Sequence, residues 1–125
     1  MTKALAVAAL VVIGCGGAEG SAPQEVAYRI DGAPSGYHTG FVVGTNAVAI
    51  FDAPISPAEA QRVRAVIERT APGRRITHVV ASHTHRDHIA GLPAYIEVGA
   101  TVLTGKGGGI AIRRQFENLP ASAIE

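Results

Sequence analysis

The segment between Ser56 and Gly73 restricts the possible folds more than any other part of this sequence. Ser56-Pro57-Ala58-Glu59 combines a capping serine, a proline at the first helical position and a glutamate three residues after the cap. These features predict a helix that starts at Ser56 and ends at Pro72-Gly73. One face of this helix is expected to be buried, because it collects Ala60, Val63, Val66, Ile67 and Thr70.

Strand patterns lie on both sides of this helix. The stretch from Glu25 to Asp31 alternates apolar and polar residues with the period of a half-buried strand. Two further strands are predicted at Gly40 to Val43 and at Ala47 to Phe51. Gly44-Thr45-Asn46 between them has turn chemistry, so these two strands should form a hairpin. After the helix, Ile76 to Ala81 is typical of a buried strand.

The rest of the chain continues the same alternation of elements. We expect a short helix from about Asp87 or His88 to Val98, stopped at Gly99, and then a strand at Thr101 to Leu103. A glycine-rich loop follows at Gly105 to Gly109, and Ile110 to Asn118 is a possible helix. This order predicts an α+β fold with a mixed sheet and helices on one face. With 125 residues, the chain has room for one domain.

The N-terminus has the pattern of a secretory signal. Lys3 is followed by an apolar run from Ala4 to Ile13 and then by Gly14 and Cys15. This run of about 10 residues is too short for a membrane span, which takes about 20. The end of the run, Val12-Ile13-Gly14-Cys15, resembles a bacterial lipobox, in which the cysteine becomes lipidated.

We therefore divide the chain into a signal peptide at residues 1–15, a flexible tether at 16–23 and a partial domain at 24–125. The expected location is periplasmic, or membrane-anchored through a lipid on Cys15. Two alternatives stay open, namely cleavage to a soluble secreted form and an N-terminal strand with an inert cysteine. Because Cys15 is the only cysteine, no disulfide can form within the chain. The net charge of +1 suggests no nucleic-acid partner.

The densest chemical signal is the phrase Ser82-His83-Thr84-His85-Arg86-Asp87-His88, which places three imidazoles and a carboxylate within six positions. Such ligands suit Zn²⁺ or Fe²⁺, and ligands one residue apart on extended backbone can point towards one ion. Asp87 and His88 lie where the chain should turn into a helix, so they can reach a second ion. Two such ions about 3.5 to 4 Å apart can share a hydroxide.

His83, His85, Asp87 and His88 resemble the His-x-His-x-Asp-His signature of the metallo-β-lactamase superfamily, and Asp52 matches an aspartate that follows the hairpin in that family. The resemblance implies the N-terminal half of an αββα sandwich and a zinc-dependent hydrolase. His83 and His85 would bind one metal, and Asp87 and His88 the other. Asp87 would also orient the metal-bound hydroxide. Substrates in the family are small molecules with ester, β-lactam amide, thioester or phosphodiester bonds.

The sequence departs from that family in the number of ligands. Each catalytic metal needs about three protein ligands, and this chain offers two per ion because no histidine follows His88. The alternative is therefore an inactive truncated lipoprotein or a weak metal-binding module. Iron remains possible, since a single-iron dioxygenase branch shares the signature. An uncovered sheet face would also favour self-association.

Four other polar residues have less specific expectations. Asp52 is either an ordinary turn aspartate or a support for the metal loop. His78 is expected to be a strand residue, and His38 and Arg86 are expected to lie at the surface.

Overall fold

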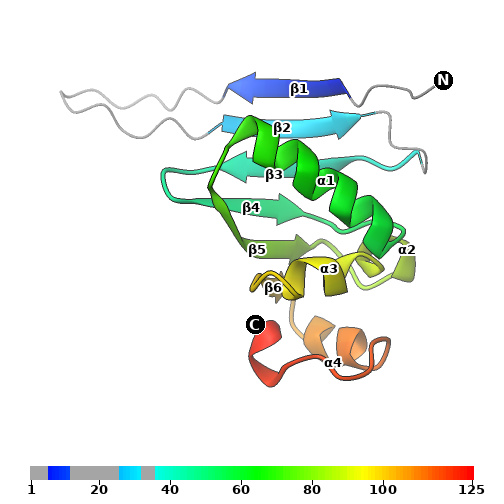
Figure 1. The fold of residues 1–125 in the computed structure, drawn as a ribbon. Helices are drawn as coiled ribbons and strands as arrows, with labels where there is room; N and C mark the ends of the chain where they lie inside the picture. The colour runs from blue at the N-terminus through cyan, green and yellow to red at the C-terminus, as the bar shows by residue number, and fades with distance from the viewer. Residues whose placement is uncertain (1–5, 12–25, 32–35) are drawn as a thin grey trace.

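The computed structural model describes residues 6–11, 26–31 and 36–125, which form one mixed sheet with helices packed against it (Figure 1). Six strands lie side by side in chain order. The pairs β1–β2, β2–β3 and β3–β4 are antiparallel, whereas β4–β5 and β5–β6 are parallel. The predicted α+β class and mixed sheet are thus confirmed. The strands are β1 (Ala6–Val11), β2 (Val26–Asp31), β3 (Thr39–Val43), β4 (Ala47–Phe51), β5 (Arg75–Ala81) and β6 (Thr101–Thr104).

The predicted hairpin between β3 and β4 is present. Val43 pairs with Val48, and the backbone N–H of Gly44 donates to the carbonyl of Ala47 at 2.9 Å. The turn at Gly44 to Asn46 therefore sets the register of the two strands. In that register Phe41 and Ile50 are partners, and both side chains are buried.

Helix α1 (Pro57–Thr70) follows the sequence prediction closely. The Ser56 hydroxyl accepts a hydrogen bond from the backbone N–H of Glu59 at 3.2 Å, as a capping serine should. Figure 1 shows α1 lying across the sheet, and its expected inner face is buried except for the half-buried Thr70.

The core lies between α1 and the sheet. Val48, Ile50 and Val79 are 0 % exposed, and the next residue along β4, Phe51, is 46 % exposed. This contrast follows from the alternation of side chains along a strand. One face of the sheet is therefore covered by helices, and Phe51 belongs to the other face.

The single helix expected from Asp87 to Val98 is wrong, because the chain forms two short helices instead. These are α2 (Arg86–Ile89) and α3 (Leu92–Ile96). The break occurs where Gly91 donates its backbone N–H to the carbonyl of Ala53 at 2.8 Å. A β-carbon at Gly91 would lie 3.0 Å from that same oxygen, so only glycine fits this approach closely. Tertiary contact has overridden the local helical pattern.

The last predicted helix is also placed wrongly. It was expected at Ile110 to Asn118, but α4 covers Gly108–Arg113 and lies beyond the β6 edge of the sheet (Figure 1). Asn118 has a positive φ of 61°, which a helix cannot include. The chain ends with a 3₁₀ turn at Ala121–Ala123 and an isolated parallel bridge between Ile124 and Val102.

At the N-terminus, Ala6–Val11, which lie within the predicted signal peptide, form β1 and pair with β2. Cys15 and the tether at 16–23 lie outside the described residues, so the signal peptide and its lipidation stay predictions. Among the residues that the structure describes, no helix has the length and apolarity needed to cross a membrane.

Candidate metal centre

The segment Ser82 to His88, which we call the ligand loop, lies at one edge of the sheet because β4 and β5 pair in parallel. The carboxyl ends of parallel strands meet at the same edge, so Asp52, after β4, comes beside Ser82, after β5. The loop then enters α2, in which Asp87 and His88 occupy the first helical turn. This is the placement expected from the sequence.

The structure brings the predicted ligands together. The ring centroid of His83 lies 4.8 Å from that of His85 and 4.1 Å from that of His88. The Nε2 atom of His88 lies 3.7 Å from a carboxylate oxygen of Asp87. His83 and His85 are exposed, whereas Asp87 and His88 are half-buried. The four side chains thus form one polar cluster at the surface.

Asp52 holds both ends of the loop. One carboxylate oxygen accepts the backbone N–H of Ser82 at 2.8 Å, and the other accepts the Ser82 hydroxyl at 2.8 Å. The second oxygen also lies 3.1 Å from Nδ1 of His88. When Nδ1 carries the proton and donates it to Asp52, Nε2 keeps its lone pair for a metal. These contacts favour the supporting role over that of an ordinary turn aspartate.

Backbone hydrogen bonds fasten the same segment to α2. The N–H groups of Ala53 and Ile55 donate to the carbonyls of His88 and Asp87 at 2.9 and 3.0 Å. Asp52 and Ile55 both have positive φ, 61° and 68°, which is rare for a β-branched residue such as Ile55. The turn between β4 and α1 therefore has a strained backbone at Ile55, where it is hydrogen-bonded to α2.

Tyr37 belongs to the site, although sequence reasoning did not find it. Its hydroxyl donates to a carboxylate oxygen of Asp87 at 2.6 Å, and its ring meets the His88 ring edge-on at 5.4 Å between centroids. The hydrogen bond raises the pKa of Tyr37 and lowers the pKa of Asp87. Tyr37 precedes Asp87 by 50 residues, so no local sequence pattern could have indicated the contact.

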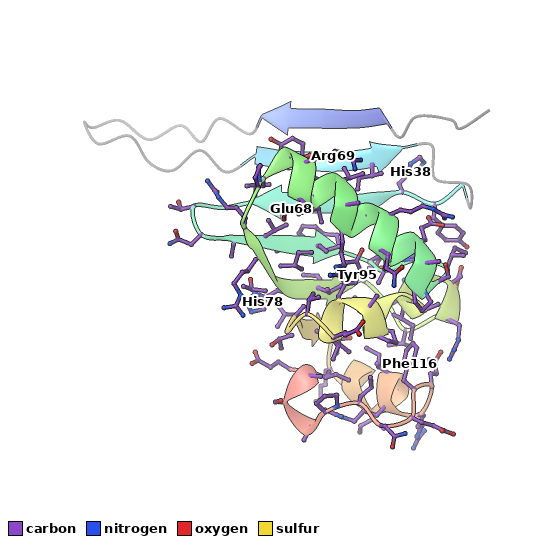
Figure 2. All side chains as sticks on the ribbon, in the orientation of Figure 1. His38, Glu68, Arg69, His78, Tyr95 and Phe116 are labelled. Atoms are coloured by element: carbon purple, nitrogen blue, oxygen red, sulfur yellow. The ribbon has the colours of Figure 1, made fainter. Side chains whose placement is uncertain are left out.

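The remaining candidates lie outside the cluster. His38 is exposed, and the ring Nδ1 of His78, in β5, is 3.0 Å from the hydroxyl of Thr77 (Figure 2). Arg86 is exposed as expected, but its guanidinium lies 4.8 Å from the centre of the Phe116 ring and donates to the carbonyl of Gln115 at 2.8 Å. Neither Phe116 nor Gln115 was predicted to reach the loop.

Comparison with known families identifies the chain. The family model of the metallo-β-lactamase superfamily matches residues 33–106. The chain belongs to the metallo-β-lactamase superfamily. The matched region contains Asp52 and the whole ligand loop, so the predicted resemblance is confirmed. A comparison with curated protein sequences gave no match.

Several solved structures share the fold. A flavo-di-iron protein from Thermotoga maritima aligns with a TM-score of 0.62 at 15 % identity, over 97 % of this chain and 32 % of that one. A subclass B3 metallo-β-lactamase from a soil metagenome library aligns with a TM-score of 0.60 at 20 % identity, over 79 % and 42 %. A metallo-β-lactamase from Cronobacter sakazakii gives 0.58 at 22 %, over 70 % and 34 %. The chain therefore spans less than half of the length of each of these three proteins.

The donors suit a metal by their chemistry, although the side chains do not yet converge on one point. Within residues 6–11, 26–31 and 36–125, no three His, Cys, Asp or Glu side chains are close enough to surround an ion. Imidazole nitrogen and carboxylate oxygen are nevertheless suitable ligands for zinc and iron. Nδ1 of His88 lies 3.1 Å from Asp52, which leaves Nε2 available to a metal. The residues present therefore fit a metal by their chemistry.

A hollow of about 610 Å³ lies beside Asp87. Apolar side chains make most of its wall, and Arg86 supplies a cation. The hollow is open to solvent, and Asp87 is the only one of the four candidate ligands that lines it. The other members of the wall are Ile55, Pro57, Ala90, Pro93 and Phe116.

Proposed function

We propose that this chain carries part of the active site of a zinc-dependent hydrolase. His83 and His85 would bind one ion, and Asp87 and His88 a second. The observation that carries this proposal is the gathering of all four donors at one sheet edge, with Asp52 hydrogen-bonded to Nδ1 of His88. Membership of the metallo-β-lactamase superfamily supports the same reading.

A bound zinc ion would lower the pKa of a coordinated water to about 7, which makes a nucleophile available at neutral pH. The protein's own contribution lies in Asp87 and its partners. Tyr37 donates to Oδ2 of Asp87 and orients the carboxylate, which would supply a ligand to the ion that His88 also binds. The hydrogen bond keeps the pKa of the carboxyl low, and the ionised form is the one that binds a metal and orients water.

The substrate class follows from the chemistry rather than from one relative. Attack by water suits an ester, a β-lactam amide, a thioester or a phosphodiester, and the apolar hollow beside Asp87 would take the group next to the cleaved bond. Iron is the alternative metal, because a flavo-di-iron protein shares the fold as well as the lactamases do.

We also propose that activity needs ligands beyond these four. A catalytic zinc takes about three protein ligands and one open position, and the four donors amount to two per ion. A weak metal-binding module without turnover is the second candidate function, because two donors per ion can bind a metal without completing a catalytic site.

The first test measures zinc binding. The full chain is titrated with Zn²⁺ against a chromophoric chelator, and bound metal is counted by elemental analysis. We expect His83→Ala combined with His85→Ala to abolish tight binding. His38→Ala is the control, since it removes one exposed imidazole outside the loop. Equal zinc affinity in the wild type and the double variant would contradict the site.

The second test separates the two functions. The zinc-loaded chain is assayed with a β-lactam, a thioester and a phosphodiester. Turnover that disappears in the double variant supports the hydrolase, whereas stoichiometric zinc without turnover supports the binding module.

Two further proposals concern where the protein is located and whether it self-associates. Lipidation of Cys15 would anchor the exported chain to a membrane, and mass spectrometry of the mature N-terminus together with Cys15→Ser tests it. A soluble product that retains Ala6–Val11 would contradict it. Self-association through the sheet face that carries Phe51 is tested by sedimentation over a range of protein concentrations.

A further inference from the structure

The segment that follows α4 contacts the middle of the ligand loop. The side-chain amide of Gln115 donates from Nε2 to the carbonyl of Thr84 at 2.8 Å, across 31 residues of sequence. Thr84 lies between His83 and His85, so this hydrogen bond reaches the peptide that separates the two proposed ligands of the first ion. Asp52 holds the two ends of the loop, at Ser82 and His88.

A second hydrogen bond runs in the opposite direction. Nη1 of Arg86 donates to the backbone carbonyl of Gln115 at 2.8 Å, and its guanidinium lies over the ring of Phe116. Gln115 therefore contacts the residues on both sides of His85, its side chain before that ligand and its backbone after it. The bond from Gln115 to the Thr84 carbonyl acts on the loop backbone directly, whereas the bond from Arg86 is made by the end of its side chain.

The orientation of the Gln115 amide is itself determined by its surroundings. Nε2 also donates to the carbonyl of Ala111, in α4, at 3.3 Å. An amide nitrogen has two hydrogens, and here both face carbonyl oxygens. The reversed amide would place its own oxygen against two others, so the observed orientation is the favourable one. The backbone N–H of Gln115 is held as well, by the carbonyl of Ile112 at 2.9 Å.

We propose that Gln115 is a positioning residue that fixes the backbone of the His83 to His85 segment and thereby sets where these two side chains can meet a metal. This inference rests on the proposed function, because the position matters only if these histidines bind a metal. Groups that orient ligands from outside the coordination sphere typically change metal affinity by about 10- to 100-fold when they are removed. Gln115 reaches the loop from a part of the chain that contributes no ligand of its own.

The test compares two substitutions of Gln115 with one control. Gln115→Met keeps the length of the side chain and removes the donor, whereas Gln115→Ala removes both the donor and the packing. Arg113→Met is the matched control. Arg113 also joins α4 to backbone carbonyls, those of Pro120 and Ala121 at 3.2 and 2.7 Å, but these belong to the C-terminal segment and not to the loop.

We expect both Gln115 variants to weaken zinc binding by about tenfold, with Arg113→Met unchanged. Urea unfolding measures the free energy of unfolding of all three variants, so that any loss of stability in the Gln115 variants can be compared with that in Arg113→Met. A residue that only secures the C-terminal segment would lower stability in Gln115→Met and Arg113→Met alike and leave zinc affinity unaltered. That result would overturn the proposal.

A readout without metal separates this inference from the proposed function. Amide hydrogen exchange across residues 83–88 of the metal-free chain should be faster in Gln115→Met than in the wild type and in Arg113→Met. Faster exchange supports the positioning role of Gln115 even if the wild type binds no zinc. A lack of zinc binding would count against the proposed function alone. Unchanged exchange would overturn the positioning role of Gln115, whatever the zinc titration shows.

Discussion

The core beneath α1 and the ligand loop at the sheet edge are built by different means. In the core, Val48, Ile50 and Val79 are 0 % exposed and pack through contacts that follow the strand period. In the loop, His83 and His85 are exposed and the backbone is held by polar side chains far away in sequence. The core contributes most of the stability, and the loop contributes geometry.

The energies of the two kinds of contact make this division sharper. Burial of one methylene group stabilises a fold by about 0.8 kcal/mol, so a whole core side chain contributes several times that amount. A hydrogen bond contributes about 1 kcal/mol net, because the unfolded chain bonds to water instead. Substitutions in the core should therefore change unfolding, and substitutions around the loop should change metal affinity.

The largest expected effect is that of Ile50→Ala in the core. Ile50 is 0 % exposed, and truncation of such a residue costs about 2 to 5 kcal/mol of unfolding free energy. Urea denaturation followed by circular dichroism measures it. Phe51→Ala is the control on the other face, where the side chain is 46 % exposed, and a similar loss in both variants would contradict the assignment of the two faces.

Gly91→Ala tests the junction between the two regions. The added β-carbon would lie 3.0 Å from the carbonyl of Ala53 and 3.1 Å from the β-carbon of Ala60. The segment between α2 and α3 must therefore move away from the turn after β4. We expect a loss of about 1 to 3 kcal/mol, the usual cost of overpacking. Gly105→Ala, with nothing within 4 Å, should stay within about 0.5 kcal/mol.

The core and the helix that covers it could be predicted from the sequence because their signals are local. The cap at Ser56, the helical face and the alternation in β4 are each formed by residues that lie close together in the sequence. The ligand residues were found by their spacing. Tyr37 and Gln115 were missed, since 50 and 31 residues separate them from their partners. The helix break at Gly91 was missed for the same reason, because a carbonyl from the turn after β4 causes it.

Asp52→Asn tests whether the loop can lose geometry without losing the fold. The amide oxygen of asparagine can still accept the backbone N–H of Ser82. The amide nitrogen that replaces the other oxygen cannot accept hydrogen bonds from the Ser82 hydroxyl and from Nδ1 of His88. We expect about tenfold weaker zinc binding and a change in unfolding free energy of about 1 kcal/mol. Zinc affinity equal to that of the wild type would show that Asp52 is only a turn residue.

Tyr95→Phe has the smallest expected effect and tests a polar group on the core side. Tyr95, labelled in Figure 2, lies in α3 and is 0 % exposed. Its hydroxyl has no hydrogen-bond partner among the described residues. Removal of a buried, unpartnered hydroxyl should leave the unfolding free energy at pH 7 unchanged or raise it by up to about 1 kcal/mol. A clear loss would mean that the hydroxyl is hydrogen-bonded in solution.

The same residue gives a prediction for alkaline pH. Burial raises the pKa of Tyr95, so above the pKa of an unfolded tyrosine, about 10, only the unfolded chain releases the phenolic proton. Its contribution to stability is therefore complete below pH 10 and is lost as the pH rises towards the folded pKa, by up to about 1.4 kcal/mol per pH unit. Tyr95→Phe should lack this slope, whereas the ionisation of exposed groups affects both chains equally. Parallel stability curves between pH 9 and 11 would show that the core admits enough water to ionise the ring, and the contrast between a dry core and a polar loop would then fail at α3.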